Sequence, residues 1–217
     1  MSQDMLMLFV EALGDTLYMV TVSSLVSALI GIPLGVILVI TGKGHIKENL
    51  LFNQTLGAVV NAARSIPFII LMVAIIPFTR IIVGTSIGTN AAIVPLTIAA
   101  IPFVGRIVES ALKEVDAGLI EAAQSMGASP RHIILKVLIP EALPSILLGL
   151  TLTVISLIGY SAMAGAIGGG GLGDLAIRYG YQRFRGDVML ATVIILIALV
   201  QVVQSSGDYF AHKVNKR

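Results

Sequence analysis

Cysteine is absent from this chain of 217 residues, and charged residues are scarce at 12%. Without cysteine the chain has no disulfide framework, no thiolate metal site and no thiol nucleophile. Soluble domains carry about 25% charged residues, and a soluble helical bundle of this size would need polar cover over its outer faces. Because 56% of the residues are hydrophobic, the composition favours residence in a lipid bilayer.

Motifs for nucleotide, metal or covalent chemistry are also missing. The run Gly42-Lys43-Gly44 lacks the upstream glycine and the hydroxyl of a P-loop, so we expect no ATP site. Gly168, Gly170 and Gly173 match the spacing of a dinucleotide-binding loop. They follow an apolar helix instead of a strand, however, which favours a flexible external turn or hinge.

The histidines, at positions 45, 132 and 212, show no metal-ligand spacing, and we expect them to lie at a solvated surface. No Ser-His-Asp arrangement or pair of carboxylates in an apolar cleft is evident. We therefore expect no metal, no cofactor and no enzyme activity in this chain.

Long apolar stretches are the dominant feature of the sequence. Crossing the hydrocarbon core takes roughly 20 apolar residues, and about five segments are long enough. They lie near residues 16–40, 58–78, 87–104, 143–163 and 188–203. Only Arg64, near the start of the second segment, is charged between the ends of a segment. The sequence predicts an all-α, polytopic membrane protein with one transmembrane domain over residues 1–217.

The distribution of lysine and arginine predicts the orientation, because cytoplasmic loops carry an excess of these residues. With the N-terminus outside, most of the 14 lysines and arginines fall in inner segments, among them Arg64, Lys216 and Arg217. The exceptions are Arg80, Arg178, Arg183 and Arg185. We expect an outer N-terminus, a cytoplasmic C-terminus and a cytoplasmic loop between the third and fourth spans.

A stripe of small residues runs along the first span. Ser23, Ser27, Gly31 and Gly35 recur every four residues, a spacing that lets another helix approach closely. Packing within the subunit is the ordinary interpretation, and a subunit interface is the alternative.

A second stripe lies on one face of the fourth span. Its members are Gly149, Thr153, Ser156, Tyr160 and Met163. They either pack against a neighbouring helix through their hydroxyls or line a mildly polar pathway. The lack of mid-span charges argues against ion coupling and suits a solute of little net charge. The predicted pathway residues are Ser156, Tyr160, Ser161 and Met163.

The segment between the third and fourth spans, at about 105–142, is a polar island. Asp116 can cap a helix, and Gly127 suits the left-handed conformation that ends one. Ser129 and Pro130 can start a second helix, which Pro140 is expected to close.

The first of these helices carries a narrow apolar stripe, formed by Leu119, Ile120, Ala123 and Met126. The helix-turn-helix is either a surface connector between two spans or a lever that docks in a groove of a partner, because docking helices look like any amphipathic helix.

A resemblance to a known family favours the lever. The residues Glu121, Ala122, Ala123 and Gly127, followed by Val137, Ile139 and Pro140, match the pattern E-A-A-x3-G-x9-I-x-L-P with two aliphatic exchanges. That pattern is the signature loop of the membrane subunits of ABC importers. Other stretches resemble the methionine-uptake branch of that family, at residues 64–68, 76–80, 83–88, 159–163 and 168–173.

The resemblance implies a type I ABC importer fold and a homodimer of permeases in a bacterial inner membrane. Each copy would dock a cytoplasmic ATPase, which binds ATP and Mg, through a coupling helix made of Glu121, Ala122, Ala123 and Gly127. An external lipoprotein would deliver the substrate, and no nucleic acid is involved. The expected function is ATP-driven methionine import; the alternatives are import of another small amino acid, or an ATPase-independent carrier or channel.

Overall fold

A computed structural model describes residues 3–215, and every regular element in that range is a helix. Four helices there are long and apolar enough to cross a bilayer: α1 (Gln3–Ile40), α5 (Thr89–Lys113), the continuous helix Pro130–Gly169 and α10 (Gly186–Val214). The bent pair α2 (Leu50–Arg64) and α3 (Phe68–Ala74) is together long and apolar enough to form a fifth, broken crossing. The predicted all-α polytopic fold is confirmed. Lys216 and Arg217, counted above as inner charges, lie outside the described residues.

The helix Pro130–Gly169 is made up of α7 (Pro130–Ile133), the π-helical turn η1 (Ile134–Leu138), α8 (Ile139–Ala164) and the π-helical turn η2 (Gly165–Gly169). Short elements connect the crossings: α4 (Ile76–Val83), α6 (Ala117–Ser125), α9 (Gly171–Leu175) and the π-helical turn η3 (Ala176–Tyr181).

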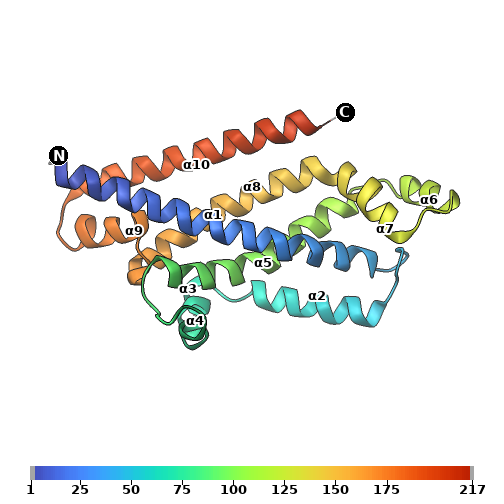
Figure 1. The fold of residues 1–217 in the computed structure, drawn as a ribbon, viewed down its shortest axis with the longest axis horizontal. Coiled ribbons are helices and arrows are strands. Elements are labelled where there is room, and N and C mark those ends of the chain that lie inside the picture. The colour runs from blue at the N-terminus through green and yellow to red at the C-terminus, as the bar shows by residue number, and fades with distance from the viewer. Residues whose placement is uncertain (1–2, 216–217) are drawn as a thin grey trace.

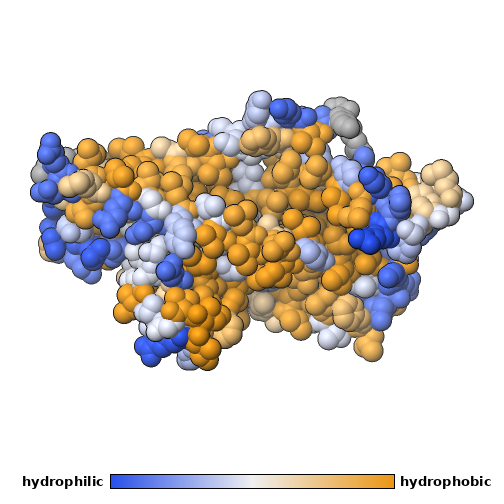
Figure 2. All heavy atoms as spheres, viewed as in Figure 1, coloured by the Kyte–Doolittle hydropathy of each residue, from blue (hydrophilic) through white to orange (hydrophobic). Residues whose placement is uncertain are grey.

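The long helices lie side by side along the longest axis of the molecule (Figure 1). The N-terminus and α9 lie at one end, here called the α9 end, and α6 and α7 lie at the other, the α6 end. On the face shown in Figure 2, apolar residues form a broad band, and hydrophilic residues gather mainly near the two ends. The long axis therefore runs across the bilayer, with the apolar band at the hydrocarbon core.

The small-residue stripe of α1 packs against α5. Ser23, Ser27, Gly31 and Gly35 are all buried. A Cβ atom on Gly31 would lie 2.6 Å from the Cβ of Val104, and one on Gly35 would lie 2.6 Å from the carbonyl oxygen of Gly105. The stripe therefore serves packing within this chain, which was the first of the two interpretations given above.

The second crossing is broken, and the expectation of one continuous span over residues 58–78 is wrong. α2 and α3 meet at 96°. Pro67 lacks an amide hydrogen and disfavours helical backbone at Ile66, so α2 ends at Arg64 and the chain changes direction before α3 begins. A local steric effect of proline thus exposes a helix end within the apolar band.

The fourth crossing begins earlier than predicted. Its helix runs from Pro130 through η1 and α8 to Gly169, so Pro140 lies inside the helix and does not end it. A proline ring ordinarily collides with the carbonyl group four residues earlier. The wider turn of η1, directly before Pro140, accommodates that ring. The second loop helix and the fourth crossing are therefore one continuous helix, here called the rod. Between α5 and the rod, only residues 114–129 lie outside the long helices.

The glycine run at residues 168–173 forms the predicted turn, and hydrogen bonds and apolar contacts pack it against the rest of the chain. The amide of Leu172 donates to the hydroxyl oxygen of Thr16 in α1 at 2.9 Å. The amide of Gly88 donates to the carbonyl of Gly168 at 2.8 Å. Leu172 and Leu175 are buried in a cluster with Phe9 of α1. The glycines allow α9 to fold back against α1, because side chains there would fill the contact.

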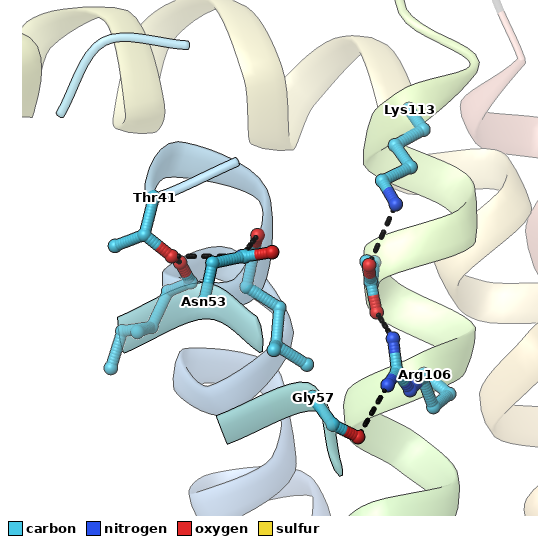
Figure 3. Close-up of polar contacts among 8 residues, drawn as sticks. Thr41, Asn53, Gly57, Arg106 and Lys113 are labelled. Atoms are coloured by element: carbon cyan, nitrogen blue, oxygen red, sulfur yellow. Dashed lines mark hydrogen bonds and ion pairs between the residues drawn. The ribbon is translucent and has the colours of Figure 1, made fainter. Parts of the chain in front are cut away.

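Polar contacts near the α6 end hold α2 to its neighbours (Figure 3). The amide nitrogen of the Asn53 side chain donates to the carbonyl of Leu38 at 2.6 Å and to the hydroxyl of Thr41 at 3.0 Å. The guanidinium of Arg106 in α5 donates to the carbonyl of Gly57 at 2.8 Å. The buried carboxylate of Glu109 pairs with Arg106 and with Lys113. This network joins the start of the broken crossing to α1 and α5.

Removal of the central carboxylate should weaken this network strongly. The Glu109→Ala substitution leaves the partly buried Arg106 guanidinium without its counter-charge, and we expect a loss of about 3 kcal/mol in the free energy of unfolding. The Lys113→Ala substitution is the control, because the Lys113 side chain is 56% exposed and should contribute less than about 1 kcal/mol. Thermal unfolding in detergent measures both. Equal effects of the two substitutions would contradict a central role for Glu109.

Candidate coupling loop and translocation pathway

The turn between the third and fourth crossings is built by local capping. The carboxylate of Asp116 accepts from the amide of Gly118 at 2.7 Å and starts α6. After α6, Gly127 adopts a left-handed conformation with φ of +76°. The hydroxyl of Ser129 accepts from the amide of His132 at 3.4 Å and starts the next helix. The predicted helix-turn-helix and the caps at both starts are confirmed.

Helix α6 has two apolar faces, and the sequence stripe divides between them. Ile120 and Ala123 are buried against the rest of the chain, whereas Leu119 and Met126 are exposed, Met126 by 82%. Ala122 is exposed as well. An apolar face left open on a polar loop is typical of a surface that another protein covers.

The four predicted coupling residues lie together in this element. Glu121 and Ala122 are exposed on α6, Gly127 is exposed in the turn that follows, and Ala123 is buried beneath them. The structure therefore places three of the four where a partner can reach them. Ala123 instead keeps the helix close to the chain, because a small side chain fits under it.

The buried face of α6 packs onto the long helices. Ile120 and Ala123 belong to one apolar cluster with Val108 and Leu112 of α5, and with Leu138 of η1. Closely packed protein interiors transmit the displacement of one element to the elements that it contacts. A force applied to the exposed face of α6 would therefore reach both α5 and the rod that contains α8.

A cavity of about 190 Å³ opens beside the break between α2 and α3. Its walls come from four helices, and the residues that line it are Ala63, Arg64, Ile66, Phe68, Leu71, Ala99, Ala100, Phe103, Thr153, Ser156, Leu157 and Tyr160. The rings of Phe68 and Tyr160 stack with centroids 4.7 Å apart. The broken crossing thus leaves a partly open space between α2, α3, α5 and α8.

The predicted pathway residues occupy different positions. Ser156 and Tyr160 line this cavity. Ser161 is buried, and its hydroxyl donates to the carbonyl of Ile158 at 2.8 Å. Met163 is 48% exposed on the outer surface of this subunit. The structure brings the first two together and leaves the other two outside the cavity.

The cavity also contains a residue that sequence reasoning did not select. Arg64 was counted as an inner-loop charge, but it stands at the end of α2 farthest from the α6 end, within the broken crossing. The available signal was the pair Arg64 and Pro67, a charge placed directly before a helix break inside an apolar segment.

The histidines differ in their surroundings. His132 and His212 are exposed, as predicted, whereas His45 is partly buried in the loop between α1 and α2. Burial and the nearby charge of Lys113 lower the pKa of His45. Among residues 3–215 there is no group of three His, Cys, Asp or Glu residues that could hold a metal ion.

The chain is similar to membrane subunits of bacterial importers. The family model described as binding-protein-dependent transport system inner membrane component matches residues 29–216. A probable D-methionine transport system permease protein of Vibrio cholerae is 60% identical over 210 residues, which cover 97% of this chain and 93% of that protein. The methionine import system permease protein of Bacillus subtilis is 48% identical over 181 residues, covering 83% and 82%.

A solved structure is similar over its full length. A chain of the MetNI methionine ABC transporter, in an inward-facing conformation, superposes with a TM-score of 0.98 at 50% identity, and all of both chains is covered. The broken second crossing and the packed glycine turn therefore belong to an architecture with an experimental counterpart.

Proposed function

This chain belongs to the family of binding-protein-dependent transport system inner membrane components, and we propose that it guides methionine across the membrane as the permease subunit of an ATP-driven importer. The observation that supports this most is α6, whose outer apolar face is open and whose inner face packs on α5 and η1. The chain is a transport subunit and not itself an enzyme, and ATP with Mg would bind to the separate ATPase.

Coupling follows from the placement of α6. A cytoplasmic ATPase would cover Leu119, Ala122 and Met126, with Glu121 available for a polar contact at the edge. Closure of two ATPases around ATP would move two copies of α6. Because Ile120 and Ala123 are packed against the long helices, that movement would tilt α5 and α8 and alternate the pathway between inward-open and outward-open states.

The remaining partners follow from the transport cycle. Two copies of this chain would enclose the pathway, and an external substrate-binding lipoprotein would deliver the substrate at the α9 end. This arrangement requires the N-terminus outside and the C-terminus in the cytoplasm of a bacterial inner membrane. The N-terminus and α6 lie at opposite ends of the long axis, which is compatible with that orientation.

Methionine is the substrate that the relatives favour. The name of the Vibrio cholerae protein specifies D-methionine, and that of the Bacillus subtilis protein specifies methionine. The cavity adds chemical support, because its aromatic, leucine and alanine side chains suit an apolar amino-acid side chain.

Vesicles containing the purified permease, its ATPase and its binding protein should accumulate methionine only when ATP is supplied to the ATPase. Both enantiomers of methionine should be tested in radiolabelled form, and radiolabelled leucine, histidine and arginine should be tested separately. Accumulation of a different amino acid would overturn the assignment of methionine. Accumulation without ATP, or without a co-purified ATPase, would identify a carrier or channel instead.

A further inference from the structure

Arg64 is a cation inside the broken second crossing, and it is exposed in this subunit. It is the last residue of α2, and α2 begins near the α6 end of the molecule. The 15 residues of α2 carry the chain about 22 Å from that end, into a hydrocarbon core roughly 30 Å thick. Charged side chains at this depth face a protein interior or a water-filled cavity, and they mark substrate pathways.

Among residues 3–215, no acidic side chain pairs with this cation. The Arg64 guanidinium has no hydrogen bond or ion pair within that range, in contrast to that of Arg106, which pairs with Glu109. Its guanidinium lies 5.7 Å from the centre of the Phe103 ring, and both residues line the cavity beside the helix break. The ring offsets part of the charge and leaves the guanidinium donors available to an anionic group.

The α8 wall of the same cavity offers acceptors. The hydroxyl of Thr153 donates to the carbonyl of Gly149, and the hydroxyl of Ser156 donates to the carbonyl of Leu152, both at 2.9 Å. Since each hydroxyl proton is already used within α8, the two oxygens can only accept further hydrogen bonds. An ammonium group, which only donates, suits these oxygens better than a carboxylate does.

The geometry points to a transient binding site for a zwitterionic amino acid in this cavity. We propose that the α-carboxylate pairs with Arg64 and that the ammonium group faces Thr153 and Ser156. The apolar side chain would contact Phe68 and Phe103. The site rests on the proposed function and adds to it a residue that recognises the carboxylate during passage, after release from the binding protein.

A thiol placed in the cavity tests this site directly, because the chain has no cysteine of its own. Ala99 lines the cavity and takes no part in the polar contacts. In the Ala99→Cys variant of the complete permease–ATPase complex in vesicles, without binding protein, modification by a small uncharged maleimide is measured. Methionine at ten times its Kd should slow the reaction about tenfold. Methioninamide, which lacks the carboxylate, should not.

Three comparisons make the result specific. The Arg64→Met substitution should remove the protection, and Arg64→Lys should keep part of it. A thiol from Thr85→Cys, outside the cavity, should react at the same rate with or without methionine. Equal protection by methioninamide, protection that survives Arg64→Met, or no protection at all would overturn the proposal. If the Arg64→Met complex does not assemble, the comparison of methionine with methioninamide decides the question alone.

The test of the binding site and the test of the proposed function can fail independently. If leucine protects the thiol in an Arg64-dependent manner while vesicles fail to accumulate methionine, the site stands and the methionine assignment fails. If methionine accumulates and the thiol is not protected, the function stands and the site fails.

Discussion

Valine in place of Gly127 is expected to release the ATPase from this chain and to abolish ATP-driven uptake. Gly127 has φ of +76°, and an added Cβ would meet no other atom within 4 Å. The expected loss of ATPase binding therefore comes from backbone strain at residue 127 and not from a side-chain clash. A left-handed conformation costs an L residue about 1–2 kcal/mol, and more for a β-branched one. Relief of that strain would turn α6 away from the rod that begins at Pro130.

The expected loss is about tenfold or more in the amount of ATPase that co-purifies, because about 1.4 kcal/mol corresponds to a factor of ten. Uptake into vesicles should fall with it. The matched control is Gly127→Asn, since asparagine tolerates the left-handed region, and we expect it to retain most of both activities. Normal ATPase binding and uptake by Gly127→Val would contradict the role of this turn in coupling.

Alanine in place of Gly173 is expected to destabilise the α9 end of the protein by about 3 kcal/mol, the upper part of the usual range for an overpacked core. A Cβ on Gly173 would collide with the carbonyl oxygen of Ala162 and lie 2.5 Å from the Cα of the same residue. Both are backbone atoms of α8, which cannot rotate away as a side chain would. For a chain of this size we expect a decrease of about 10 °C in the midpoint of thermal unfolding.

Gly14→Ala is the control for this experiment. Gly14 lies within α1, is exposed and has no atom within 4 Å of an added Cβ. There alanine should be neutral or should stabilise the helix by about 0.5–1 kcal/mol. Thermal unfolding of both variants in detergent measures the difference. A Gly173→Ala protein as stable as Gly14→Ala would show that the glycine turn yields easily, contrary to the packing described above.

Much of the architecture could be predicted because it depends on neighbours in the chain. A long apolar stretch must satisfy its own backbone hydrogen bonds in lipid, so it becomes a helix whatever surrounds it. The caps of the coupling loop are equally local: Asp116 and Ser129 each bond an amide two or three residues away. The small-residue stripe of α1 could also be recognised in the sequence, since its spacing places all four members on one face of a helix.

Two features of the structure did not follow from local rules alone. Pro140 was expected to end a helix, but a widened turn before it lets the helix continue. The glycines at residues 168–173 were expected to form a flexible turn, and nothing in their local pattern indicates that Thr16, more than a hundred residues away, accepts a hydrogen bond from the amide of Leu172. Composition alone does not reveal such partners.

The sequence by itself determined that this chain lives in a bilayer, crosses it as helices and presents a capped helix between the third and fourth crossings, because all three depend on short-range periodicity and backbone hydrogen bonding. Only the tertiary structure decided what the broken second crossing does. It brings Arg64 beside Phe103 and into the lining of one cavity with Thr153 and Ser156, residues that are far apart in the chain. Their proximity depends on how three helices pack, which no local pattern specifies.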